Sequence, residues 1–195
     1  MDRLQTRRGQ TGSGTIQAAC KSRENSRDNR RQRSKASGAS RKPWFASGSN
    51  SVVAADALID TGAILALLDR KDNWHAACAA AFRQVRLPLL TSEAVLTELF
   101  HLVGNSNREV DAAWKFVRSG ALIVSPIVET DFPALDTLMK RYRDRPMDFA
   151  DATLVHLAER HSLSLILTVD RDDFETYRIQ GRRRFRLAPP RGIAR

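Results

Sequence analysis

The sequence predicts a doubly wound α/β fold of three layers, α/β/α, with a central parallel sheet of four to five strands. Three observations predict it. From Ala54 onward, short apolar runs alternate with stretches that carry apolar residues at helical spacing. The runs are almost continuously apolar, which is typical of strands buried on both faces of a parallel sheet. The length of 195 residues suits one such domain with appendages at its ends.

The expected elements follow in order along the chain. We expect strands at residues 57–59, 87–90, 121–124 and 163–169, and an edge strand at 182–187. Between them we expect helices at residues 61–69, 72–85, 92–104, 107–119, 130–142 and 149–161. Within these helices, Trp74 and Trp114 are interpreted as core residues. In such a sheet, ligands bind outside the carboxyl ends of the strands.

Charge divides the chain into parts. Residues 1–50 contain 12 Lys and Arg against 3 acids, and residues 178–195 contain 7 Arg and no acid. Residues 51–177 contain 13 basic and 19 acidic residues, so the expected folded body is acidic. We expect a disordered basic extension over residues 1–53, a folded domain over 54–190 and a tail over 191–195. The extension is either a tether for nucleic acid or translated sequence upstream of the true start.

Composition excludes several classes of protein. The two cysteines, Cys20 and Cys78, provide neither a disulfide framework nor a cysteine zinc site. The sequence has no apolar stretch long enough to span a bilayer and no signal peptide, so we expect a soluble cytoplasmic protein that does not enter membranes. A Walker-type phosphate loop is absent from the sequence, which argues against an NTPase.

Two acids follow two of the expected strands. Asp60 comes directly after the run at 57–59, and Asp170 comes directly after the run at 163–169. If these two strands are neighbours, both carboxylates face one crevice and repel each other unless a cation lies between them. A simpler interpretation of Asp60 is a helix N-cap, because a helix is expected to begin behind it.

Glu98 lies inside an expected helix rather than at its end. At helical spacing it shares an arc with Ala94, Val95 and Leu102, so we expect its carboxylate to point toward the apolar side. A charged group buried there needs a partner or a metal ion. The alternative is a glutamate at the edge of the stripe with its carboxylate in water.

Asp148 and Asp151 stand three residues apart at the start of the last expected helix. Asp148 is the expected N-cap and Asp151 the better ligand candidate, although capping alone could explain the pair. With Asp60, Glu98 and Asp170 they make an all-oxygen set, which selects Mg²⁺ or Mn²⁺. One or two such ions could support in-line attack on a phosphodiester.

Four motifs together resemble the pattern of the PIN-domain family, which includes the VapC-like toxins. They are IDTGA at 59–63, TSEAVLTEL at 91–99, MDFADA at 147–152 and LTVDRDDF at 167–174. The resemblance covers roughly residues 56–190 and implies a PIN-like, Rossmann-like nuclease domain. The basic extension departs from the compact form that is usual in this family, which leaves its start site and its role open.

The resemblance also implies an activity and assigns roles. It implies an endoribonuclease that uses Mg²⁺ or Mn²⁺ to cut single-stranded RNA, without a fixed side-chain base. It further implies the toxin of a type II toxin–antitoxin pair, with a cognate antitoxin protein and a homodimer as partners. The catalytic and metal-binding acids would be Asp60, Glu98, Asp151 and Asp170, with Asp148 as an auxiliary metal acid and Thr61 and Thr168 as hydroxyl supports.

Basic residues near these acids are candidates for RNA phosphate contacts. They are Lys140, Arg141, Arg143 and Arg145, and in the C-terminal segment Arg182, Arg183, Arg184 and Arg186. A solvated run of charge explains them equally well. The four histidines show no metal-ligand spacing and are interpreted as surface or packing residues.

Two other functions are compatible with parts of the pattern. A non-catalytic regulatory module that binds metal and RNA would use the same acids without turnover. A phosphoryl-transfer enzyme with an aspartate nucleophile would want a second aspartate two positions after Asp60, where the chain has Gly62.

Overall fold

The computed structural model describes residues 55–104, 106–145 and 147–190. The predictions for the extension 1–53 and the tail 191–195, and for Cys20, therefore lie outside the described residues. Within the described residues, none of the helices is both long and apolar enough to cross a bilayer.

Five parallel strands form the central sheet in the order β3-β2-β1-β4-β7. They are β1 (Ala57–Ile59), β2 (Leu89–Ser92), β3 (Leu122–Ser125), β4 (Leu165–Leu167) and β7 (Arg186–Ala188). The predicted parallel sheet is confirmed. The first and fourth strands are neighbours, with Ile59 opposite Leu167, so the condition for Asp60 and Asp170 to face one crevice is met. The strand expected at 182–187 forms later than predicted, as β7 at the edge beside β4.

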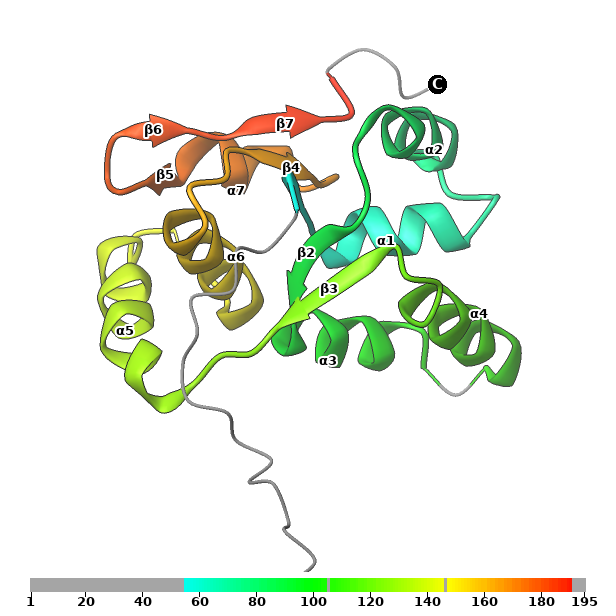
Figure 1. Ribbon diagram of the computed structural model, residues 1–195, viewed down its shortest axis with the longest axis horizontal. Helices are drawn as coiled ribbons and strands as arrows, with labels where there is room; N and C mark the ends of the chain where they lie inside the picture. The colour runs from blue at the N-terminus through cyan, green and yellow to red at the C-terminus, as the bar shows by residue number, and fades with distance from the viewer. Residues whose placement is uncertain (1–54, 105, 146, 191–195) are drawn as a thin grey trace, which may run out of the picture. The chain divides into compact units, whose positions relative to one another are not determined.

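Six of the helices correspond to the predicted ones. They are α1 (Thr61–Leu68), α2 (His75–Gln84), α3 (Glu93–Leu102), α4 (Asn107–Val117), α5 (Phe132–Arg141) and α6 (Phe149–Arg160). A 3-10 turn, η1 (Glu129–Asp131), precedes α5. Figure 1 shows α5 and α6 on one side of the sheet and α1, α2 and α4 on the other. This distribution follows from right-handed crossovers, because the chain reverses direction across the sheet between β3 and β4.

Two short elements near the C-terminus, α7 (Arg171–Thr176) and β5 (Arg178–Ile179), were not predicted. A third, β6 (Arg183–Arg184), lies in the range expected for the edge strand but pairs with β5 in a hairpin. Asp172 and Asp173 lie in the first turn of α7. These elements are too short to carry a readable hydrophobic period.

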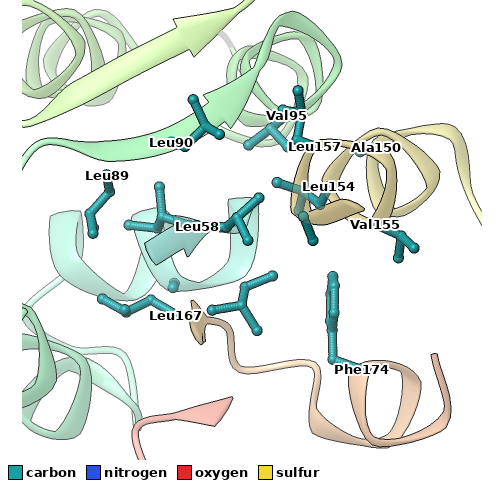
Figure 2. Packing of buried hydrophobic residues seen from close by; sticks show 14 of the residues in the cluster. Leu58, Leu89, Leu90, Val95, Ala150, Leu154, Val155, Leu157, Leu167 and Phe174 are labelled. Atoms are coloured by element: carbon teal, nitrogen blue, oxygen red, sulfur yellow. The ribbon is translucent and has the colours of Figure 1, made fainter. Parts of the chain in front are cut away.

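Buried residues of the strands and of helices α1 to α6 form the core, and a large part of it lies between the sheet and α6. Figure 2 shows Leu58 of β1, Leu90 of β2 and Leu154 of α6 turned toward a shared interior. All three are fully buried, and burying each stabilises the fold by about 1.5–3 kcal/mol. The α6 helix contributes most of its length to this core, which fixes its first turn, the site of Asp151, at the edge of the sheet.

Two predictions about apolar side chains were wrong. Trp114, expected in the core, is 49% exposed, and its ring packs on that of Phe100. Leu102, expected on the buried arc of α3, is 54% exposed. Both occupy the margin of an amphipathic stripe, where helical spacing alone does not decide burial. Trp74 is partly buried against the core, as expected.

Candidate functional site

The predicted acids lie where parallel strands end and the next helices begin. Asp60 follows β1 and is the N-cap of α1, and Asp170 follows β4 and is the N-cap of α7. Asp148 is the N-cap of α6. The simpler interpretation of Asp60 and Asp148 as helix caps is therefore correct as far as it goes. Capping uses only part of a carboxylate, because each oxygen has two acceptor positions.

Asp60 is the best-anchored of these acids. Its Oδ1 accepts a hydrogen bond from the backbone N–H of Thr61 at 2.7 Å, and its Oδ2 accepts one from Thr168 Oγ1 at 2.9 Å. Thr168 reaches it because Ile59 and Leu167 are opposite one another in the parallel ladder, so the next residues of both strands are neighbours. Asp60 is only 7% exposed and has a fixed orientation.

Glu98 joins the same network from α3. Thr61 Oγ1 donates a hydrogen bond to Glu98 Oε2 at 2.7 Å. Glu98 is half-buried, which agrees with a carboxylate turned toward the sheet edge. Thr61 thus contacts two acids at once, one through its backbone N–H and one through its hydroxyl.

Thr168 bridges the network to Asp170. Its Oγ1 donates to Asp60 and accepts a hydrogen bond from the backbone N–H of Asp170 at 2.9 Å. Asp170 itself is exposed. A continuous series of hydrogen bonds therefore runs from Glu98 through Thr61, Asp60 and Thr168 to Asp170. It joins α3, the start of α1 and the residues that follow β1 and β4.

Asp151 lies behind this series, in the first turn of α6. Its backbone N–H donates to Asp148 Oδ1 at 2.8 Å, and its Oδ2 accepts a hydrogen bond from the Tyr177 hydroxyl at 3.0 Å. Asp151 is 8% exposed, whereas Asp148 is exposed. The site thus has two buried acids, Asp60 and Asp151, and more exposed acids at its opening.

Sequence reasoning missed Tyr177. Its side chain is fully buried, and its ring packs edge-on against those of Tyr142 and Phe174. The sequence carries no signal for this contact, because Tyr177 follows the short helix α7 and its hydroxyl reaches Asp151 only through the tertiary fold.

A second contact that the sequence analysis did not predict, a hydrogen bond between Ser92 and Thr153, fixes α3 relative to α6. Ser92, the N-cap of α3, shares a hydrogen bond of 2.7 Å with Thr153 of α6, and both side chains are buried. This contact holds the helix that carries Glu98 beside the helix that carries Asp151.

Burial and mutual repulsion perturb the buried acids. Burial raises the pKa of Asp60 to about 6, against the lowering effect of its hydrogen bonds from Thr168 and Thr61. The carboxylates of Glu98 and Asp148 raise the pKa of Asp60 further. Its ionised form therefore lacks a compensating positive charge.

Asp151 is perturbed more strongly. Burial raises its pKa to about 8, and the carboxylates of Asp148, Asp60 and Asp170 add to the rise, while the Tyr177 hydrogen bond opposes it. Asp60 and Asp151 each respond to acids from other elements, so electrostatic repulsion links these two buried acids to Glu98, Asp148 and Asp170. A bound cation would offset this repulsion, and carboxylate oxygens are donors of the kind that Mg²⁺ and Mn²⁺ prefer.

The acids do not form a closed coordination shell. Among the described residues, no group of three or more His, Cys, Asp and Glu side chains is arranged as a ready metal site. Mg²⁺ commonly keeps several waters and is held by one or two carboxylates, so an open arrangement suits it.

The predicted RNA contacts differ in how they are engaged. Lys140 pairs with Asp136 one turn away. Arg145 donates to the backbone oxygen of Asp172 at 3.0 Å and to Thr176 Oγ1 at 2.8 Å. Arg145 thus anchors α7. The side chains of Lys140 and Arg145 are both exposed, and each keeps N–H groups that can donate to a phosphate.

Arg141 and Arg143, the other two predicted RNA contacts, are also exposed. In the C-terminal segment, the four candidate arginines, Arg182, Arg183, Arg184 and Arg186, are exposed on and beside the β5–β6 hairpin and β7.

Comparison with known proteins points to one family. A family model described as PIN domain matches residues 57–179. Over 135 residues the chain is 32% identical to Ribonuclease VapC26 of Mycobacterium tuberculosis, a match that covers 68% of this chain and 99% of the relative. Among solved structures, the fold is similar to that of VapC20 of Mycobacterium tuberculosis, a sarcin-ricin loop cleaving toxin. The TM-score is 0.55 at 21% identity, over 60% of this chain and 91% of that one.

Proposed function

The chain belongs to the PIN-domain family, and from this membership we propose that it is an endoribonuclease that uses Mg²⁺ or Mn²⁺ to hydrolyse phosphodiester bonds of single-stranded RNA. Its relative at 32% identity is named a ribonuclease. The observation that carries the proposal is the hydrogen-bonded series from Glu98 to Asp170, which gathers acids from separate elements at one edge of the sheet.

Each residue of the site has a proposed role. Asp60, Glu98, Asp151 and Asp170 hold the metal ion, and Asp148 assists from the opening. Thr61 and Thr168 orient the carboxylates of Glu98 and Asp60 through the hydrogen bonds described above. When bound, the ion neutralises the acids, makes water a stronger acid and stabilises charge on the leaving oxygen.

The protein's own acids set the conditions for this chemistry. Asp60 and Asp151 must lose their protons to bind a cation, and their raised pKa values mean that protons compete with the metal near neutral pH. No side chain is assigned as a general base. Residues from several elements hold the site rigidly, which favours a fixed position for the scissile phosphate.

RNA binding requires positive charge outside the acid site, because the acids repel phosphate. We assign this role to Lys140, Arg141, Arg143 and Arg145, which lie at and beyond the end of α5, before the first turn of α6. Binding that rests on such contacts weakens steeply as salt rises.

We further propose that the chain is the toxin of a type II toxin–antitoxin pair. The solved structure to which its fold is similar is described as a toxin. The proposed partners are a cognate antitoxin protein and a second copy of this chain, and the proposed location is the cytoplasm. Co-expression with the product of the neighbouring reading frame should abolish toxicity and copurify both proteins.

Cleavage of single-stranded RNA by the purified chain tests the proposed activity. Mn²⁺ or Mg²⁺ should support cleavage, and EDTA should stop it. Asp170→Asn should remove cleavage, whereas Asp111→Asn, at an exposed acid of α4, should leave it unchanged. Metal-dependent RNA binding without cleavage by the wild-type chain would instead identify a non-catalytic regulatory module.

A further inference from the structure

An apolar cavity opens beside the acid site. Its volume is about 910 Å³, which is within the usual range for ligand sites. It is lined by one face of α3, by Ile127 before η1, and by the first residues of α5 and α6. The cavity is continuous with the acid site, because Glu98 and Asp148 line both.

Two phenylalanines hold their rings at this cavity while partly exposed to water. Phe132, at the start of α5, is 52% exposed, and Phe149, at the start of α6, is 47% exposed. Phenylalanine is more often buried, and exposed apolar surface gathered at a cavity marks a binding site. Phe149 directly follows Asp148, so its ring is adjacent in sequence to an acid of the site.

The charge of the cavity wall excludes a phosphate as its ligand. Among the described residues, its lining carries the carboxylates of Glu93, Glu98 and Asp148 and neither lysine nor arginine. A neutral, flat group meets no such repulsion and can stack on an aromatic ring. Thr97 and His101 of α3 also line the cavity, and their side chains can exchange hydrogen bonds with a ligand.

We propose that this cavity binds an unpaired nucleobase next to the cleaved phosphodiester, stacked on Phe149 and Phe132. The inference rests on the proposed ribonuclease function, since a phosphodiester held at the acids has its flanking bases within one nucleotide of the cavity. Only a base released from pairing can enter, so the cavity selects single-stranded RNA. The polar groups of α3 then read the edge of that base.

Equilibrium binding of modified RNA tests the proposal separately from cleavage. Single-stranded RNAs that each lack one base are titrated into the full-length Asp170→Asn chain with Mn²⁺, alongside the intact RNA. Loss of the base that occupies the cavity should weaken binding roughly tenfold, as expected for lost stacking. In Phe149→Ala and Phe132→Ala variants of the same chain, this penalty, which is the ratio of the dissociation constants of the base-lacking and intact RNAs, should fall toward one.

Two further variants make the result specific. Trp114→Ala removes an aromatic side chain of similar exposure that does not line the cavity, and it should keep the full penalty. Phe149→Leu keeps apolar volume without an aromatic ring and should lose most of the penalty. Unchanged melting temperatures show that the variants are folded.

Several results would overturn the proposal. An equal penalty in the Phe149→Ala, Phe132→Ala and Trp114→Ala variants would locate the base elsewhere. If RNAs that lack a base bind the parent Asp170→Asn chain as tightly as intact RNA at every position, the cavity does not recognise a base. If the phenylalanine variants bind these RNAs normally but no longer bind a protein partner, the cavity is a protein interface. If the wild-type chain binds RNA with the predicted base dependence but never cleaves it, the nuclease assignment fails and the cavity assignment stands.

Discussion

The buried and exposed halves of the acid site differ although their residues have equivalent positions in the fold. Asp60 and Asp170 both follow neighbouring parallel strands and both cap helices, yet Asp60 is 7% exposed and Asp170 is exposed. Asp151 and Asp148 repeat this contrast within the first turn of α6. The comparison shows that Asp60 and Asp151 are buried, where their negative charge is unfavourable, whereas Asp170 and Asp148 are carboxylates of the same kind that remain in contact with water.

The largest expected effect is a loss of RNA cleavage in both Asp60→Asn and Asp170→Asn, together with a change in stability in Asp60→Asn alone. Asp60→Asn and Asp170→Asn should each reduce cleavage at least about 100-fold, because each removes a proposed metal ligand. Asp60→Asn should also stabilise the metal-free fold at pH 8 by about 1–3 kcal/mol, because it removes a buried charge whose pKa is raised. Asp170→Asn should leave stability nearly unchanged. RNA cleavage assays and urea unfolding measure the two properties.

Equal effects of the two substitutions on stability would contradict the contrast between buried and exposed acids. If Asp60→Asn and Asp170→Asn change stability equally at pH 8, burial does not distinguish the two halves of the site. Asp111→Asn controls for the loss of an exposed acid.

A pH titration of stability should show the burial effect directly. Asp60 and Asp151 have pKa values of about 6 and about 8 in the folded chain, above their ordinary value of 3.8. Acids whose pKa is raised by folding stabilise the folded state fully below the ordinary value and lose that contribution as pH rises through the folded value. In EDTA, the free energy of unfolding should therefore fall between about pH 4 and pH 8, by at most about 9 kcal/mol for the two acids together, because each pKa unit corresponds to about 1.4 kcal/mol.

Divalent metal should flatten this dependence, because it binds the ionised carboxylates of the folded chain. The measurement is urea unfolding at several pH values, with EDTA or with Mn²⁺. A fall in stability that is the same in both conditions would show that the buried acids do not bind the metal.

Gly62 allows the chain next to Asp60 to pack closely against Val169, which lies next to Asp170. A Cβ at this position would lie 2.6 Å from Val169 Cγ2, between Thr168 and Asp170 in the chain. Gly62→Ala should therefore destabilise the fold by about 1–3 kcal/mol and lower cleavage, because Val169 must move and shift its neighbours. The double variant Gly62→Ala/Val169→Ala should recover much of the cleavage. Failure to recover would show that the clash is not the cause.

The smallest expected effect comes from the hydroxyl of Tyr177. Tyr177→Phe removes the donor to Asp151 Oδ2 and should weaken Mn²⁺ binding about tenfold without unfolding the chain. Tyr142→Phe is the matched control, because its hydroxyl accepts from the backbone N–H of Arg178 and its ring packs on Tyr177. Electron paramagnetic resonance of Mn²⁺ measures the affinity. Equal affinities in the two variants would limit Tyr177 to packing.

Sequence reasoning predicted the frame of the fold because its signals are local. Continuous apolar runs predicted the strands at β1 and β4, and the carboxyl ends of parallel strands lie at one edge of a sheet. Asp60 and Asp170 could therefore be expected in one crevice on the condition that the two strands are neighbours, which only the structure shows. The β7 edge strand was predicted from alternating residues at 182–187.

The rest depended on tertiary contacts that leave no periodic signal. Tyr177 reaches Asp151 because the chain that follows α7 packs against α6 through β5. Trp114 lies at the margin of a helical stripe, so its exposure depends on which neighbour covers that margin. The difference in burial between Asp60 and Asp170 is likewise set by what packs over each strand end.

Anomalous diffraction from a crystal soaked in Mn²⁺ tests the central claim most directly. The account predicts one or two manganese peaks at the sheet edge, about 2 Å from carboxylate oxygens of both the buried Asp60 or Asp151 and the more exposed Glu98 or Asp170. Manganese bound only at other surface acids, with the Asp60 and Asp151 carboxylates free of metal at pH 8, would contradict it.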